Sequence, residues 1–139
     1  MLRLIVPTLS LLLTLPLAAQ AASKQDYDLN RMLQKVAKES SVGTPRAINE
    51  DILDQGYTVE GKALVNHLSV RQSHAESMQA NPEQVRDQLG ASVCRNNGYR
   101  NLMSKGAVMV YRFTEYKTNR PVMDQAFDAA SCVAGNKKK

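Results

Sequence analysis

The fold is indicated most clearly by a stretch in which apolar and polar residues alternate, ILDQGYTVEGKALVNHLSV (residues 52–70). On each side of a turn at residues 60–62, the apolar positions share one face of an extended chain. These positions are Leu53, Tyr57, Val59, Leu64, Leu68 and Val70. Because side chains in a strand point alternately to the two faces of a sheet, the stretch predicts a β-hairpin with one buried face.

A second hairpin is predicted near the C-terminus. Residues 107–116 (AVMVYRFTEY) are rich in Val, Tyr and Phe, which favour strands. Residues 117–120 (KTNR) are typical of a turn, and residues 121–130 again alternate apolar with polar side chains. The second hairpin is expected to end just before Cys132.

Helices are predicted before and between the two hairpins. Residues 29–37 repeat apolar side chains at helical spacing, and Gly43 follows as an end signal. Residues 73–93 predict a second helical segment, broken near its middle by an Asn-Pro pair, that carries Cys94 near its C-terminal end. A short helical turn is expected at residues 99–104.

The order of elements predicts an α+β fold. Residues 44–50 are expected to form a loop, because their Thr-Pro-Arg start disfavours a helix. The predicted order is αββαββ, with a four-stranded antiparallel sheet made of the two hairpins. Its helices are expected to pack on one face, and one disulfide is expected to close the domain.

The first 21 residues have the layout of a bacterial signal peptide. A positive charge at Arg3 is followed by an apolar run over residues 4–17, and Ala19 and Ala21 are the small residues that signal peptidase requires. We therefore expect cleavage after Ala21. A membrane anchor is the alternative, but the run is shorter than the roughly 20 residues that span a bilayer and contains two prolines.

Cleavage is expected to leave one globular domain, residues 22–139. A lipoprotein would carry a cysteine directly after the cleavage site, and Ala22 stands there instead. The mature protein is therefore predicted to be secreted or periplasmic, without integral membrane association. Its lysine-rich end, residues 137–139, is predicted to be a disordered tail.

Cys94 and Cys132 are the two cysteines of the chain. In an oxidising compartment they most simply form one structural disulfide. Catalytic or metal-binding cysteines would usually stand in a CxxC pair or beside clustered histidines, and the sequence has neither arrangement.

A basic segment in the second half of the chain is the candidate partner-binding surface. The formal net charge is +5, but lysines of the C-terminal tail contribute part of it, so we do not infer nucleic-acid binding. Between residues 95 and 120, six basic residues stand against the single acidic Glu115, interleaved with Tyr99, Tyr111 and Tyr116. The predicted surface comprises Arg95, Arg100, Lys105, Arg112, Tyr116, Lys117 and Arg120. It would suit an acidic protein, a polyanionic cell surface or lipid headgroups; the alternative is an ordinary solvated face.

The sequence predicts no enzyme, no cofactor and no metal site. His67 and His74, with Glu76 nearby, lack a third ligand at suitable spacing. No GxSxG elbow marks a nucleophile. A further acidic cluster lacks the spacing of an EF-hand calcium loop and more simply solvates a strand edge. That cluster comprises Glu50, Asp51, Asp54 and Glu60.

Four segments carry a resemblance to a known family: residues 48–57 (INEDILDQGY), residues 92–95 (SVCR), Leu102-Met103 with Gly106, and residues 113–117 (FTEYK). Together they resemble a small family of secreted bacterial proteins described as quorum-sensing-regulated virulence factors, over nearly all of the mature chain. The resemblance implies an α/β domain outside the cytoplasm, expression that follows cell density, and a role in host interaction. It supplies no catalytic residues.

Our functional expectation is a secreted, non-enzymatic interaction module that acts on host or cell-surface partners. The alternative is a periplasmic assembly or inhibitor protein that binds an envelope partner. An exposed edge strand is one way in which such a protein could bind.

Overall fold

The computed structural model describes residues 17–135 and the side chains of residues 24–133, so most of the predicted signal peptide and the predicted lysine tail lie outside the described residues. The fold is α+β, as predicted. Its elements are α1 (Leu17–Ser40), β1 (Arg46–Ala47), β2 (Ile52–Glu60), β3 (Ala63–Val70), α2 (Gln72–Ala80), α3 (Pro82–Arg95), α4 (Asn97–Ser104), β4 (Val108–Glu115), β5 (Pro121–Phe127) and α5 (Ala129–Gly135).

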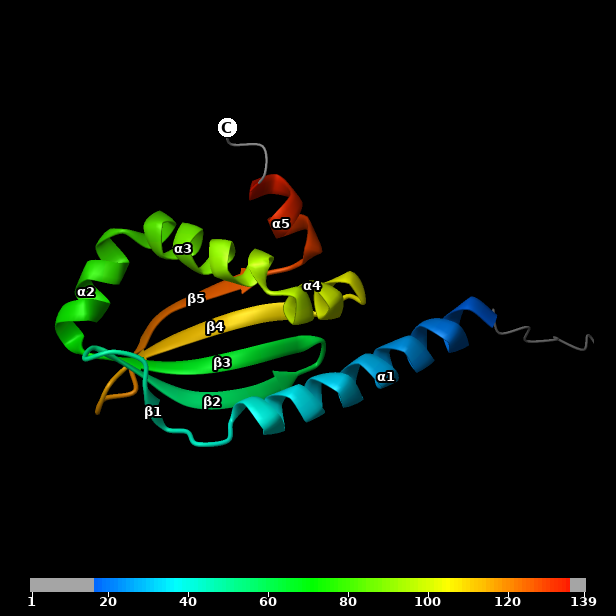
Figure 1. Ribbon diagram of the computed structural model, residues 1–139, viewed down its shortest axis with the longest axis horizontal. Helices are drawn as coiled ribbons and strands as arrows, with labels where there is room; N and C mark the ends of the chain where they lie inside the picture. Colours follow the sequence, from blue (N-terminus) through cyan, green and yellow to red (C-terminus); the bar gives the residue numbers. More distant parts are fainter. Residues whose placement is uncertain (1–16, 136–139) are drawn as a thin grey trace, which may run out of the picture.

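The sheet has five strands in the order β1-β2-β3-β4-β5 (Figure 1). Both predicted hairpins are confirmed, because β2 pairs antiparallel with β3 and β4 pairs antiparallel with β5. The prediction of an all-antiparallel, four-stranded sheet is wrong, because β3 and β4 pair in parallel. Helices α2, α3 and α4 return the chain to the end of the sheet where β3 began, so β4 must run in the same direction as β3.

The fifth strand comes from a segment that was expected to be a loop. Arg46 and Ala47 form β1 and pair antiparallel with Asp54 and Leu53. A strand of two residues is too short to show alternation, so no pattern in the sequence predicts it. With β1, the subdivided second helix and the terminal α5, the observed order differs from αββαββ.

The helices pack on one face of the sheet, as predicted (Figure 1). The main hydrophobic core joins α1, α3 and α4 to β3, β4 and β5. A smaller cluster seats Met78 of α2 against Leu68 and Phe113. Helix α1 begins before the predicted cleavage point, at Leu17, and in the described part of the chain no helix is long and apolar enough to cross a membrane.

The predicted disulfide is present between Cys94 on α3 and Cys132 on α5, with Cα atoms 5.4 Å apart. It fixes the C-terminal helix to the helical layer.

The opposite face of the sheet carries neither of these hydrophobic clusters. Strand alternation turns Val65, His67 and Ser69 of β3 to this face, together with Arg112 of the neighbouring β4. We call it the uncovered face. Val65 is nevertheless 0% exposed, so side chains of the neighbouring strands must cover it.

Candidate functional site

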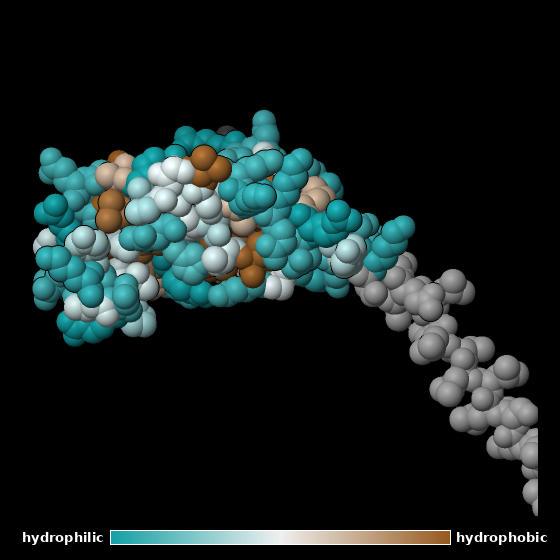
Figure 2. Space-filling view, turned by 90° about the horizontal axis from the view of Figure 1, so that it is seen from below, coloured by the Kyte–Doolittle hydropathy of each residue, from teal (hydrophilic) through white to brown (hydrophobic). Residues whose placement is uncertain are grey.

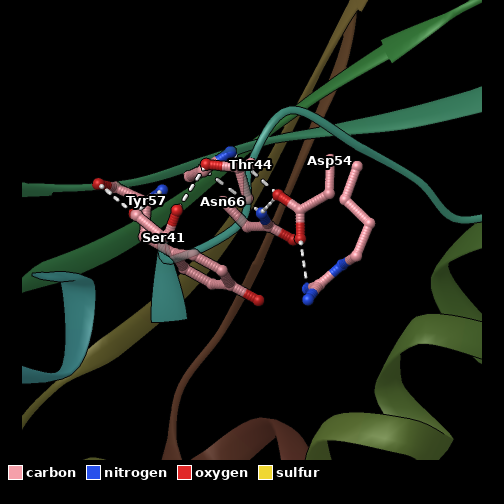
Figure 3. Close-up of polar contacts among 7 residues, drawn as sticks. Ser41, Thr44, Asp54, Tyr57 and Asn66 are labelled. Atoms are coloured by element: carbon pink, nitrogen blue, oxygen red, sulfur yellow. Dashed lines mark hydrogen bonds and ion pairs between the residues drawn. The ribbon is translucent and has the colours of Figure 1, made fainter. Parts of the chain in front are cut away.

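The outer edge of β2 is occupied by side chains from α1 and the turn that follows it. The Ser41 Oγ accepts a hydrogen bond from the Tyr57 backbone N–H at 2.8 Å and donates one to the Tyr57 carbonyl at 3.4 Å (Figure 3). At the end of the strand, the Asn30 side-chain amide donates to the Gly61 carbonyl at 3.0 Å. An added strand would have to break these bonds.

A buried carboxylate fixes β1 and the bulge of β2 (Figure 3). Asp54 is 4% exposed, and its Oδ1 accepts hydrogen bonds from the Gly56 backbone N–H and the Asn66 amide, both at 2.9 Å. Its Oδ2 lies 3.6 Å from an Arg46 guanidinium nitrogen. Every buried side-chain polar atom of the described residues has a hydrogen-bond partner. This network therefore holds structure and leaves no buried group aimed at a ligand.

The outer edge of β5 is also occupied. The Gln79 side-chain amide of α2 donates to the Val122 carbonyl at 3.3 Å. The Arg86 guanidinium of α3 donates to the Ala126 carbonyl at 3.2 Å. The outer edges of β2 and β5 thus carry side-chain hydrogen bonds that oppose strand addition.

Viewed from below Figure 1, the molecule has a mostly hydrophilic surface with small, separate apolar patches (Figure 2).

Two of the three tyrosines in the basic segment belong to the core. Tyr99 and Tyr111 are partly buried against the main hydrophobic cluster, as is Tyr57. Burial raises the pKa of the Tyr111 hydroxyl to about 12, and burial followed by the adjacent Tyr99 raises that of Tyr57 further. Only Tyr116 of the segment's three tyrosines is strongly exposed, at 48%.

The structure does not bring the seven predicted surface residues together. Arg95, Arg100 and Lys105 lie at the α3–α4 end, before β4 begins. Tyr116, Lys117 and Arg120 lie at the β4–β5 turn, beyond the other end of β4. An eight-residue strand separates the two groups by about 25 Å. The seventh residue, Arg112, lies between them on the uncovered face.

Arg112 is held in an ion-pair network. Its guanidinium lies 2.8 Å from a Glu60 carboxylate oxygen on β2 and 3.3 Å from an Asp124 oxygen on β5. The hydrogen bond from Arg112 lowers the pKa of Glu60, and the same bond raises the pKa of Arg112. Arg112 is therefore engaged in joining strands.

A hollow of about 340 Å³ opens at the end of the uncovered face, beside Tyr116. It is lined by Ala47, Asn49, Glu50, Asp51, Ile52, Leu53, Ser69, Arg71 and Tyr116, and we call it the β1–β2 hollow. Two exposed apolar side chains stand at this end of the molecule, Ile48 at 56% and Tyr116 at 48%. In the described part of the chain, no carboxylate lies within ion-pair distance of Arg71.

The loop that forms one wall of the hollow is well fixed. The Asn49 Oδ1 accepts hydrogen bonds from the backbone N–H groups of Asp51 (2.8 Å) and Ile52 (3.0 Å). The Arg71 backbone N–H donates to the Asp51 carbonyl at 3.0 Å. A fixed wall lowers the entropy lost on binding, which favours recognition of a partner.

Sequence reasoning identified Tyr116 but missed Ile48 and Arg71. Ile48 could have been noticed as an apolar residue inside a polar loop, although only the fold shows that it is exposed near Tyr116. The hollow also joins two of the segments that carry the family resemblance, residues 48–57 and 113–117.

The histidines and acidic residues do not assemble into one centre. A His67 ring nitrogen lies 2.6 Å from the Thr58 hydroxyl on the uncovered face, whereas His74 lies on α2, 3.8 Å from Asp51. Of the acidic cluster, Asp54 is buried and Glu60 pairs with Arg112. Among the described residues, no three potential metal ligands come together.

Comparison with solved structures places this fold among known proteins. It matches a putative secreted protein from Pseudomonas aeruginosa at 69% identity and a TM-score of 0.76, covering 78% of this chain and 96% of that one. It also matches the pilotin EpsS of the Vibrio vulnificus type II secretion system (14% identity, TM-score 0.68, 79% and 96% coverage). The pilotin AspS from Vibrio cholerae gives 17% identity, a TM-score of 0.64 and coverage of 81% and 99%. The two pilotins share the fold at low identity.

A family model matches most of the chain, residues 22–133, while none of the curated proteins compared with the chain matches it. The match confirms the resemblance seen in the sequence. The chain therefore belongs to the family described as "Putative quorum-sensing-regulated virulence factor".

Proposed function

We propose that this chain is an exported, non-enzymatic domain that binds a protein partner of the bacterial envelope through the β1–β2 hollow. Export is supported by the signal-peptide layout, by a family match that begins at Ala22, and by similarity to a putative secreted protein. The pilotins that share the fold belong to a type II secretion system, which supports an envelope partner over a host target.

The observation that carries this proposal is the composition of the hollow. Tyr116, which is 48% exposed, lines the hollow together with Ile52, Leu53 and Arg71, and Arg71 forms no ion pair among the described residues. Tyrosine and arginine are enriched among the residues that contribute most of the binding energy at protein interfaces. The hollow is also at the small end of the size range of binding pockets.

The occupant that these residues fit is a segment of a partner protein with a large apolar side chain. This side chain would fill the hollow against Leu53 and Tyr116. Because the outer edges of β2 and β5 already carry side-chain hydrogen bonds, we favour a surface contact at the hollow over strand addition.

Non-enzymatic action is supported by the state of the candidate nucleophiles and bases. Both cysteines are in the disulfide. His67 and His74 lie on different elements. In the described part of the chain, His67 contacts Thr58 and His74 lies near Asp51, and neither is hydrogen-bonded to a serine or cysteine that it could activate.

Site-specific photo-crosslinking in the native bacterium tests the proposal. A benzophenone amino acid replaces Tyr116, and the matched control replaces Tyr27, which is exposed at 63% on α1. We expect one envelope protein to be captured from position 116 and not from position 27. The captured protein is then purified, and its affinity is measured with Tyr116→Ala and Tyr27→Ala variants.

We expect Tyr116→Ala to weaken binding by about tenfold to a hundredfold, because hot-spot truncations cost about 2 kcal/mol. Tyr27→Ala should leave binding unchanged. The same captured proteins at both positions, or equal affinities for both variants, would contradict the assignment of the hollow. Capture of a host protein would instead favour the secreted-effector alternative.

A further inference from the structure

We propose that a second surface, formed by Arg95, Arg100 and Lys105, binds the anionic headgroups of a phospholipid membrane. We call these three residues the α4 basic surface. It lies at the opposite end of β4 from the β1–β2 hollow, so the two surfaces can act independently.

The three cations are not neutralised within the described part of the chain. None of them forms an ion pair there. The Arg95 Nε donates to the Ala91 carbonyl at 2.9 Å, which leaves its terminal nitrogens available. The Lys105 ammonium lies 4.0 Å from the Met32 sulfur, a weak acceptor. By contrast, Arg112 and Arg120 are both paired with carboxylates.

The three cations lie on and beside the short helix α4. Asn96 separates α3 from α4 and caps α4 by accepting a hydrogen bond from the Tyr99 backbone N–H at 3.1 Å. Helix α4 buries Leu102 and Met103 against the core and exposes its polar side chains. An eight-residue helix is about 12 Å long, so Arg95 before it, Arg100 within it and Lys105 after it span one short surface.

The stretch of sequence that carries the three cations has charges of one sign. From Gln88 to Thr114 the sequence contains no Asp or Glu.

A membrane suits this surface better than an acidic protein does. The exposed side of α4 carries Asn, Arg and Ser without a large apolar side chain, so it lacks the apolar centre of a protein interface. The one strongly exposed aliphatic residue nearby is Val133 on α5, at 66%. Clustered lysines and arginines bind anionic headgroups through their summed charge and do not need a large apolar area.

Co-sedimentation with lipid vesicles tests the proposal. The oxidised mature chain, residues 22–139, is mixed with vesicles of phosphatidylcholine alone or with a quarter of phosphatidylglycerol. The variant reverses all three cations (Arg95→Glu, Arg100→Glu, Lys105→Glu). The control has the same net charge and reverses three exposed cations elsewhere (Lys38→Glu, Lys117→Glu, Arg120→Glu). Circular dichroism verifies that all of these exposed substitutions preserve the fold.

We expect the wild type to bind the anionic vesicles, to ignore neutral ones, and to dissociate at high salt, because salt screens exposed charges. The α4 variant should bind at least tenfold less, because each basic residue near an anionic surface contributes several-fold to binding. The binding of the control variant to anionic vesicles should fall by less than threefold.

Absence of binding to anionic vesicles at low salt would overturn the proposal. An equal loss in both triple variants would also overturn it, because binding would then follow net charge. A variant lacking Lys137–Lys139 separates the tail from the surface. If this deletion abolishes binding and the α4 variant does not, the assignment to α4 is wrong.

Discussion

Arg112 and Glu60 lie on strands that are not neighbours, and their 2.8 Å ion pair crosses β3 above Val65. The register places Glu60 opposite Ala63 and Arg112 opposite His67, so the line between the two side chains passes over Val65. Val65 is 0% exposed on a face that carries neither hydrophobic cluster, so we expect this ion pair to contribute to its burial. Part of the basic segment thus stabilises the sheet.

Replacing Arg112 tests this role. Arg112→Ala removes the cover of Val65 and leaves the Glu60 and Asp124 carboxylates close to each other. We expect the free energy of unfolding to fall by about 1–2 kcal/mol, because ion pairs that form a network stabilise a fold more than isolated pairs do. Arg120→Ala, whose side chain is 69% exposed, should change it by less than about 0.5 kcal/mol. Urea denaturation measures both, and equal values would contradict the proposed cover.

The same network predicts acid sensitivity. The hydrogen bond from Arg112 lowers the pKa of Glu60 below its ordinary value of 4.5. A carboxylate whose pKa is lower in the folded state contributes stability above its unfolded pKa and loses it as the pH falls through the folded value. The free energy of unfolding should therefore fall below about pH 4.5.

Glu60→Gln should flatten this part of the stability curve, as measured by urea denaturation across pH. The control is Glu76→Gln on α2, which removes an exposed carboxylate outside any ion pair of the described residues. An unchanged slope in Glu60→Gln would show that the Arg112 contact does not set the acid response.

The buried carboxylate makes a separate prediction. Asp54→Ala would remove the acceptor of the Gly56 N–H and the carboxylate beside Arg46, and it would leave the Asn66 amide with the Gly56 carbonyl alone. We expect a loss of about 3 kcal/mol in the free energy of unfolding, because unpaired buried groups carry the full desolvation cost. Asp54→Asn should lose less, since its amide oxygen can still accept. Asp87→Ala, at an exposed position on α3, should leave the free energy of unfolding nearly unchanged. An equally small change in Asp54→Ala would contradict the structural role of the Asp54 carboxylate.

The disulfide should contribute strongly to stability. Cys94 and Cys132 are 38 positions apart, and the loop-entropy estimate for that separation is about 4 kcal/mol. We expect the double variant Cys94→Ser/Cys132→Ser to lose about this much in guanidinium denaturation. Reduction of the wild type should reproduce the loss. A fully stable reduced protein would contradict the prediction.

The sequence patterns predicted most of the side chains that face the core, but not which strands are neighbours. The prediction for Leu53 is wrong: the bulge between Asp54 and Gly56 places it opposite Ser69 on the uncovered face, and Ile52 packs against the smaller cluster instead. Alternation over β3 places Leu64 and Leu68 on the same face whether β4 runs parallel or antiparallel. The direction of β4 depends on how far the intervening helices carry the chain, and the boundaries of short helices are only weakly marked in the sequence. The two-residue strand β1 has no recognisable pattern in the sequence.

The candidate sites, like the fold, were only partly predictable from the sequence. Charge and aromatic content indicated the basic segment, and Tyr116 does line the hollow. Only the register shows that Arg112 reaches Glu60 across β3, and only tertiary structure brings Arg71 and Tyr116 to one hollow. Side chains that are close in sequence are thus divided among the β1–β2 hollow, the Arg112 ion pairs and the α4 basic surface.

We infer that the chain works outside the cytoplasm as a mature, disulfide-closed binding domain. Native mass spectrometry of the endogenously expressed protein, taken without reductant from periplasm and culture supernatant, tests this inference. We predict a chain that begins at Ala22, is two hydrogens lighter than the reduced form, and occurs in part as a complex with one envelope protein. A full-length or reduced chain, retained in the cytoplasm and always free of a partner, would contradict the claim.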